Sequence, residues 1–154
     1  KDIVKHFNLK SGDKFLDVGC AKGFLVKDML ALGIDAYGLD ISEYAIKNCE
    51  PEVIGRLHIG TADSLPFSDH SFNAVFSKDT LHDLEKDRCI KAIKEIQRLS
   101  PGNGFIQVDS YKTQEEKEVF SRWVLTASTH YFPNEWEDIF KYCGYTGDWY
   151  WTIH

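Results

Sequence analysis

The stretch FLDVGCAKGF, residues 15–24, decides the fold of this chain. An apolar run ends in an acid at Asp17, and two glycines, Gly19 and Gly23, follow four residues apart. Many nucleotide-binding folds begin in this way, with a strand that turns through glycine into a helix. A glycine turn by itself does not say which nucleotide is bound, so the motifs further along the chain have to decide it.

The bulk composition is that of a single globular domain spanning residues 1–154. Of the 154 residues, 43% are hydrophobic and 27% are charged, and the net charge is −6. This negative charge argues against nonspecific binding of nucleic acid, which depends on positive charge. No apolar run approaches the ~20 residues that span a bilayer, and no signal peptide is visible. The four cysteines form no CxxC pair, so neither a zinc site nor a disulfide framework is indicated, and a reducing compartment, the cytoplasm, is expected.

Apolar periodicity and turn residues predict strands that alternate with helices. We expect strands at residues 14–18, 34–39, 56–59, 72–77, 105–108 and 148–153. We expect helices at residues 2–8, 23–32, 42–49, 84–99, 114–129 and 133–142. This alternation predicts an α/β fold of the doubly wound, Rossmann-like type, with a mostly parallel sheet of six to seven strands and helices on both faces.

Polar residues follow the expected strands at their carboxyl ends. The first strand runs into Asp17 and Gly19, the second ends at Asp40, the third leads to Asp63, and the fourth ends in SKD, residues 77–79. Doubly wound sheets bind ligands at this edge, where the strand order reverses. The sequence therefore predicts a binding site formed by these residues.

Three glycine-turn patterns compete for residues 17–24. A phosphate-binding P-loop needs a lysine where Phe24 stands. The dinucleotide pattern GxGxxG fails at two positions, which are occupied by Ala21 and Phe24. The third pattern, an acid followed by three glycines at alternate positions, fits except that Ala21 replaces the middle glycine.

With this turn, the chain resembles the class I methyltransferases that use S-adenosylmethionine. It looks closest to their small-molecule branch (type 11), typified by the ubiquinone- and menaquinone-biosynthesis methyltransferases. The similarity covers residues 10–110 well and the remainder loosely. Four motifs carry it in order: LDVGCAKG, YGLDIS, GTADSLPFSDHSFNAVFS and RLSPGNGFIQVDS. The resemblance implies S-adenosylmethionine as cofactor, with S-adenosylhomocysteine as product. It also implies that residues 1–110 form the cofactor core and that residues 111–154 form substrate-facing helices and a final strand.

The resemblance assigns the first half of the cofactor site. Asp17 would be an indirect partner of the amino group, or alternatively a surface acid that holds the loop. The glycine turn would let the backbone approach the methionine half of the cofactor, or it would be only a tight turn between strand and helix. The residues of this turn are Gly19, Cys20, Ala21 and Gly23. Because alanine takes a positive φ only at a cost, we expect a negative φ at Ala21.

The same resemblance assigns the nucleoside half. The carboxylate of Asp40 would accept hydrogen bonds from both ribose hydroxyls, since a carboxylate has two oxygens. The alternative is that Asp40 is a partner for the dipole of the next helix. Ile41 would pack on the adenine or in the core. Asp63 would accept a hydrogen bond from the adenine amino group, or its side chain would form an Asx turn. The remaining implied contacts are Ala62, Ser64 and Leu65 at the adenine and the backbone carbonyls of Ser77 and Lys78 at the ammonium.

Candidates for acceptor chemistry are fewer. His82 matches a position where relatives often carry histidine, and it could act as a general base or hold its loop by a hydrogen bond. An aromatic wall around the acceptor, or simply a core, could be formed by Tyr111, Trp123, His130 and Trp136. No metal is expected.

The predicted function is transfer of a methyl group to an oxygen, nitrogen or carbon atom of a small molecule. One alternative is a non-catalytic domain that binds S-adenosylmethionine to regulate or scaffold. Another is a protein or nucleic-acid methyltransferase on the same fold, although SKDT replaces the Asn/Asp-Pro-Pro-Tyr/Phe stretch of many nucleic-acid enzymes. The acceptor and the oligomeric state are left open.

Overall fold

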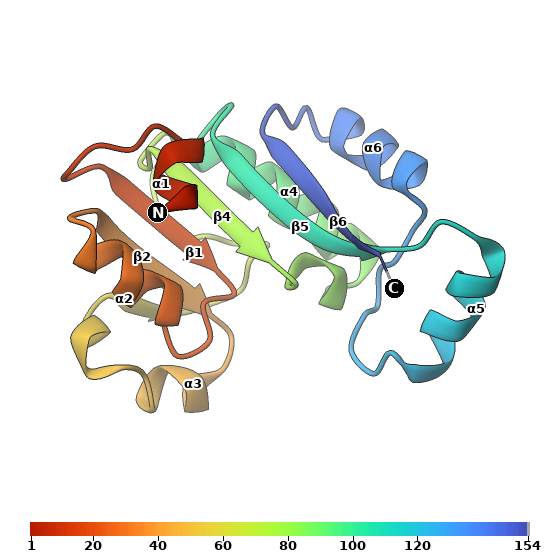
Figure 1. The fold of residues 1–154 in the computed structure, drawn as a ribbon, viewed down its shortest axis with the longest axis horizontal. Coiled ribbons are helices and arrows are strands. Elements are labelled where there is room, and N and C mark those ends of the chain that lie inside the picture. Colours follow the sequence, from red (N-terminus) through yellow and green to blue (C-terminus); the bar gives the residue numbers. More distant parts are fainter. Residues whose placement is uncertain (154) are drawn as a thin grey trace.

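A six-stranded, wholly parallel sheet forms the centre of the protein (Figure 1). The computed structural model describes residues 1–153, except for the side chain of Trp123. The strand order is β3-β2-β1-β4-β5-β6, which confirms the doubly wound fold. The strands are β1 (Lys14–Val18), β2 (Asp35–Asp40), β3 (Leu57–Ile59), β4 (Ala74–Lys78), β5 (Gly104–Ser110) and β6 (Asp148–Ile153).

Strand order reverses between β1 and β4. From β1 the chain moves outward to β3 and then returns to the other side of β1, where β4 pairs with it. The segments that leave β1 and β4 therefore separate above the sheet, and a crevice opens between them. This is where the sequence places its candidate site.

Helices cover both faces of the sheet. Within the described residues these are α1 (Asp2–His6), α2 (Phe24–Ala31), α3 (Glu43–Lys47), α4 (Lys86–Leu99), α5 (Gln114–Trp123) and α6 (Pro133–Tyr142), with short 3₁₀ turns η1 (Pro51–Val53) and η2 (Leu81–Asp83). Figure 1 shows α2 in front of the sheet and α4 behind it.

Alternation along the strands explains the two layers. Leu16 and Val18 face a core cluster that includes residues of α4 and α6, whereas Phe15 faces a second cluster that includes residues of α2. Successive side chains of a strand point to opposite faces, so one apolar run supplies both cores. Burial on both faces is why β1 and β4 consist largely of apolar residues.

The helix expected at residues 114–129 is shorter than predicted. α5 ends at Trp123, and Val124 takes an extended conformation. Thr129 leaves the helix to bind the segment before α4: its backbone N–H donates to the carbonyl of His82 at 2.9 Å and its hydroxyl donates to the carbonyl of Leu84 at 2.6 Å. Tertiary hydrogen bonds therefore outweigh helical propensity here.

Other boundaries moved by a few residues. α4 begins at Lys86 because residues 81–83 form the separate turn η2, and α3 is limited to five residues. The predicted cap of α3 is confirmed, since the hydroxyl of Ser42 accepts from the backbone N–H of Ala45 at 3.1 Å. Among residues 1–153, no helix has the length and apolar character needed to cross a membrane.

Candidate functional site

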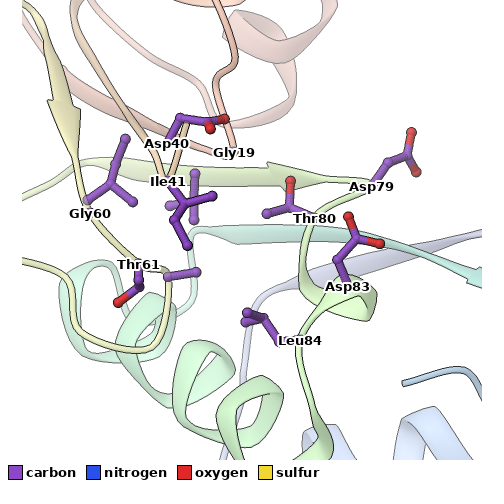
Figure 2. A pocket seen from close by; sticks show the side chains of 12 residues that line it. Gly19, Asp40, Ile41, Gly60, Thr61, Asp79, Thr80, Asp83 and Leu84 are labelled. Atoms are coloured by element: carbon purple, nitrogen blue, oxygen red, sulfur yellow. The ribbon is translucent and has the colours of Figure 1, made fainter. Parts of the chain in front are cut away.

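A cavity of about 260 Å³ lies at the carboxyl ends of β1, β2 and β4. Its wall comes from residues 18–19, 39–41, 60–62, 79–80 and 83–84. Figure 2 shows Asp40 and Ile41 on one side, with Thr80, Asp83 and Leu84 across from them. The location matches the one expected from the strand ends, and four of the expected residues line it: Gly19, Asp40, Ile41 and Ala62.

The glycine turn requires glycine at both of its ends. Gly19 has a φ of +87°, and a β-carbon there would overlap the side chain of Thr80. Gly23 has a φ of +82°, and a β-carbon would lie 2.8 Å from Cγ2 of Val53. The left-handed φ and the lack of space both exclude larger residues. Gly19 therefore keeps bare backbone in the cavity wall.

Ala21 adopts a φ of +47°, so the expected negative φ is wrong. The left-handed conformation directs its backbone N–H to Oδ2 of Asp40, at 2.8 Å. Alanine pays roughly 1–2 kcal/mol for this conformation. The hydrogen bond to a charged acceptor offsets that cost and ties the turn to β2.

Asp40 is positioned by two backbone amides. Its Oδ2 accepts from Ala21, and its Oδ1 accepts from the N–H of Ser42 at 2.8 Å. Each carboxylate oxygen can accept two hydrogen bonds. One acceptor site on each oxygen therefore remains for a ligand in the cavity, which suits a pair of neighbouring hydroxyls.

Asp17 is a buried carboxylate beneath the turn. It is only 6% exposed, and within residues 1–153 no hydrogen bond or ion pair reaches its carboxylate. Burial, and secondly the charge of Asp40, raise the pKa of Asp17 to about 7. Asp17 lies outside the cavity wall, so it can act on a ligand only through its charge or through a bridging group. A positively charged ligand group nearby would lower the free-energy cost of burying the ionised carboxylate of Asp17.

The raised pKa of Asp17 predicts an unusual pH dependence of stability. Between the ordinary pKa near ~4 and the folded value of about 7, the folded state holds a proton that the unfolded state has lost. Stability of the ligand-free protein should therefore fall by a few kcal/mol as the pH rises through this window, and Asp17→Asn should remove most of the fall. Urea unfolding at several pH values measures it, with Asp28→Asn, an exposed acid on α2, as control. Parallel profiles of wild type and Asp17→Asn would contradict this origin.

The carboxylate of Asp63, expected at the adenine, is paired with a side chain of α4. Arg88 on α4 donates to both of its oxygens, Nε to Oδ2 at 2.8 Å and Nη2 to Oδ1 at 3.0 Å. These bonds hold the pKa of Asp63 well below its usual range. The N–H of Ser64 donates to Thr61, and that of Leu65 donates to Glu95 at 2.8 Å. Of the four loop residues expected at the adenine, 62–65, only Ala62 lines the cavity.

Arg98 fixes the loop that carries these residues. Its guanidinium donates to the carbonyls of Leu65 and Phe67 and to the carboxylates of Glu95 and Asp69. The loop is thus fastened to α4, which lies behind the sheet. Only the pair of Arg98 with Glu95 is local; no local pattern signals the pairings of Arg88 and Arg98 with the loop, because the loop partners lie about thirty residues away in the sequence.

The segment after β4 contributes more than was expected. Ser77 is fully buried, and Lys78 extends to within 3.9 Å of Asp79; neither lines the cavity. Asp79, which the strand-end pattern indicated, lines it together with Thr80, Asp83 and Leu84, which were missed. The polar character of Thr80 and Asp83 in SKDTLHD, at the end of a strand, was the available signal.

His82 lies behind the cavity wall and is 5% exposed. The backbone N–H of Asp109 donates to its Nδ1 at 3.2 Å. In the neutral ring the proton is therefore on Nε2, which lies 3.5 Å from Oδ2 of Asp109 and 3.7 Å from Oδ1 of Asp83. The ring lone pair is already used inside the protein, an arrangement that favours a positioning role over a general base.

The structure places the expected aromatic wall in the core. Tyr111 is fully buried, its hydroxyl donates to the carbonyl of His130 at 3.1 Å, and burial raises its pKa to about 12. Trp136 is fully buried, and its indole donates to the carbonyl of Asp109 at 3.1 Å. His130 is half-buried, and burial lowers its pKa. None of these three lines the cavity; the side chain of Trp123 lies outside the described residues. Within the described residues, no group of three or more histidines, cysteines or acids is arranged to hold a metal.

Comparison with known proteins gives a consistent result. The family model described as a methyltransferase domain matches residues 16–108. The chain is 33% identical over 113 residues to demethylmenaquinone methyltransferase of Geobacillus stearothermophilus, covering 68% of this chain and 47% of that protein. It is 28% identical over 134 residues to phosphoethanolamine N-methyltransferase 1 of Zea mays, covering 80% and 26%.

A solved structure shows the same fold. The putative methyltransferase in complex with the Haloferax volcanii Trm112 methyltransferase activator superimposes with a TM-score of 0.73 at 21% identity, covering 93% of this chain and 66% of that one. The chain spans a quarter to about half the length of the curated relatives that it matches.

Proposed function

The chain belongs to the methyltransferase domain family, and we propose that it transfers a methyl group from S-adenosylmethionine to an oxygen, nitrogen or carbon atom of a small molecule. The observation that carries this proposal is the cavity in which the bare backbone of Gly19 and the carboxylate of Asp40 meet. Both features stand at the point where the strand order reverses, where folds of this type bind nucleotides.

The residues present fit the proposed cofactor. Asp40 has one acceptor site left on each oxygen for the ribose hydroxyls. Ile41 exposes 66% of its surface at the cavity, where it can pack against a flat ring. Asp17 is a buried acid close to the turn, and a positively charged group of the cofactor would favour its ionised form. When bound, the cofactor supplies a methyl group that is already activated by the positive charge on its sulfur.

The protein's contribution to methyl transfer is then mainly one of position. Alignment of donor and acceptor within a cavity supplies most of the rate enhancement when the leaving group is already reactive. Residues 1–110 would form the cofactor core and supply the cavity wall, and residues 111–154 would support that wall from behind, as Thr129 does through the carbonyls of His82 and Leu84. The four free cysteines are consistent with a cytoplasmic location as part of this proposal.

Small-molecule acceptors are favoured over macromolecules. By their names, the two relatives above act on phosphoethanolamine and on demethylmenaquinone. The net charge of −6 disfavours a nucleic-acid substrate. If the chain instead had a non-catalytic role, it would bind the cofactor but transfer no methyl group.

Two measurements test the proposal. Calorimetry should show binding of S-adenosylmethionine and S-adenosylhomocysteine. Label from [methyl-³H]S-adenosylmethionine should then appear in low-molecular-mass products when the protein is incubated with a metabolite extract, and not in added protein or tRNA. Absence of cofactor binding refutes the proposal. Binding without transfer of label to low-molecular-mass compounds, protein or tRNA favours the scaffold alternative.

His82 gives a separate prediction. Because His82→Ala removes the acceptor of the Asp109 N–H and most of a buried ring, it should lower the free energy of unfolding by about 1–3 kcal/mol and slow turnover, while cofactor affinity stays unchanged. His82→Asn, which can place an acceptor near Nδ1, should restore most of both. Chemical denaturation and initial rates measure the effects. If His82→Asn is fully stable and yet as slow as His82→Ala, His82 acts as the base.

A further inference from the structure

We infer that the methyl acceptor is an amine and that the carboxylate of Asp83 binds it; this inference rests on the proposed function. The first observation is the sign of the charges in the cavity wall. Three carboxylates line it, those of Asp40, Asp79 and Asp83, and among the described residues no lysine, arginine or histidine does. Lys78, which directly precedes Asp79 in the chain, lies outside the wall, and its Nζ approaches Oδ2 of Asp79 to 3.9 Å.

The three carboxylates are not equivalent. Asp40 is held by two backbone amides and stands beside the glycine turn, where the ribose is expected. Asp79 has the ammonium of Lys78 as a neighbour. Asp83 stands across the cavity from Asp40, beside Thr80 and Leu84 (Figure 2). Asp83 is therefore the carboxylate whose position suits the acceptor.

Asp83 is supported from behind and open in front. Its side chain is 43% exposed at the cavity. Behind it lies buried His82, whose Nε2 approaches Oδ1 of Asp83 to 3.7 Å, too far for a hydrogen bond. The backbone N–H of Thr129 donates to the carbonyl of His82 and its hydroxyl to that of Leu84, so the turn η2 is clamped on both sides of Asp83. A fixed carboxylate with unused acceptor sites toward a cavity suits a donor with positive charge.

Charge decides between the acceptor classes. A carboxylate or phosphate brought close to Asp83 would be repelled by it and by the two other acids, and repulsion between like charges grows as water is displaced. A neutral hydroxyl gains no Coulomb attraction. An ammonium is attracted, and it can donate up to three hydrogen bonds, so that Asp83 can hold it and still leave the nitrogen directed into the cavity. Apolar surface for the body of the acceptor comes from Leu84, which adjoins Asp83.

The step balances in protons and electrons. A protonated amine first loses one proton to water, which frees the nitrogen lone pair, while the remaining N–H groups donate to Asp83. The nitrogen then forms a bond to the methyl carbon while the carbon–sulfur bond breaks and its electron pair stays on sulfur. The nitrogen of the product carries the positive charge, which again faces the Asp83 carboxylate.

Three compounds with the same ring test the assignment: benzylamine, benzyl alcohol and benzoate. Each is titrated by calorimetry into the protein saturated with S-adenosylhomocysteine. Benzylamine should bind at least about tenfold more tightly than the other two, as a charge-assisted hydrogen bond would provide. In Asp83→Asn this preference should disappear, whereas affinity for S-adenosylmethionine should stay within about twofold of wild type.

A matched control removes the same charge nearby. Asp87 is an exposed acid in the first turn of α4 and lies outside the cavity wall. Asp87→Asn should keep the full preference for benzylamine, which separates direct contact from long-range charge.

The outcomes separate the two proposals. If wild type binds neither S-adenosylmethionine nor S-adenosylhomocysteine, the proposed function fails and the amine assignment falls with it. If both bind but benzylamine has no advantage, only the amine assignment is overturned. A loss of S-adenosylmethionine affinity in Asp83→Asn, with benzylamine binding kept, would overturn it as well, because Asp83 would then belong to the cofactor.

Discussion

Gly19→Ala is expected to abolish measurable binding of S-adenosylmethionine and to lower the free energy of unfolding by about 2–5 kcal/mol. Two costs combine at this position. The φ of +87° places an alanine in the left-handed region, and the added β-carbon meets the side chain of Thr80. Either the turn or the segment after β4 must move, and both form the cavity wall. Chemical denaturation and calorimetry measure the two effects.

Gly12 provides a matched control for Gly19. Its φ is +86°, almost the same, but no atom lies within 4 Å of a β-carbon built there. Gly12→Ala should therefore show the backbone cost alone, roughly 1–2 kcal/mol, with cofactor affinity unchanged. The difference between the two variants isolates the collision with Thr80. Equal destabilisation, or intact cofactor binding in Gly19→Ala, would show that the cavity does not depend on the close approach of these two segments.

Asp40→Ala is expected to weaken cofactor binding by roughly 1–3 kcal/mol, which is about fivefold to more than a hundredfold in affinity. The loss has two sources, because Asp40 also holds the amides of Ala21 and Ser42. Calorimetric titration with S-adenosylhomocysteine measures it. Unchanged affinity would refute the ribose assignment.

Asp35 is the control within the same strand. It begins β2, at the opposite end from Asp40, and pairs with Arg56 outside the cavity wall. Asp35→Ala should reduce stability slightly, since exposed and half-exposed ion pairs contribute about 0–1 kcal/mol, and should leave cofactor affinity as it is. A similar loss of affinity in both variants would mean that the effect of Asp40→Ala comes from general weakening of β2.

Within the site, the sequence located the residues attached to strand ends and missed those placed by longer connections. Gly19 directly follows β1, and Asp40 is the last residue of β2. The topology of a parallel sheet brings residues at such strand ends together. Asp83 comes from a short 3₁₀ turn whose orientation depends on Thr129, forty-odd residues later. No pattern in the neighbourhood of Asp83 contains that information.

The same distinction applies to the backbone. The end of α5 at Trp123 and the left-handed Ala21 were both mispredicted. In each case a hydrogen bond to a distant partner outweighs the local preference: Thr129 binds the segment 82–84, and Ala21 binds Asp40. Helical periodicity and glycine preference describe only interactions between near neighbours in the chain.

The sequence by itself therefore determined the doubly wound parallel sheet, its family and the strand-end residues of the cavity, because periodic burial and glycine turns are local properties that recur along the chain. Tertiary structure alone decided that Asp63 pairs with Arg88, that Tyr111 and Trp136 belong to the core, and that Asp83 rather than His82 faces the cavity. These outcomes depend on which distant segments satisfy each buried polar group, and that competition is settled only when the whole chain is packed.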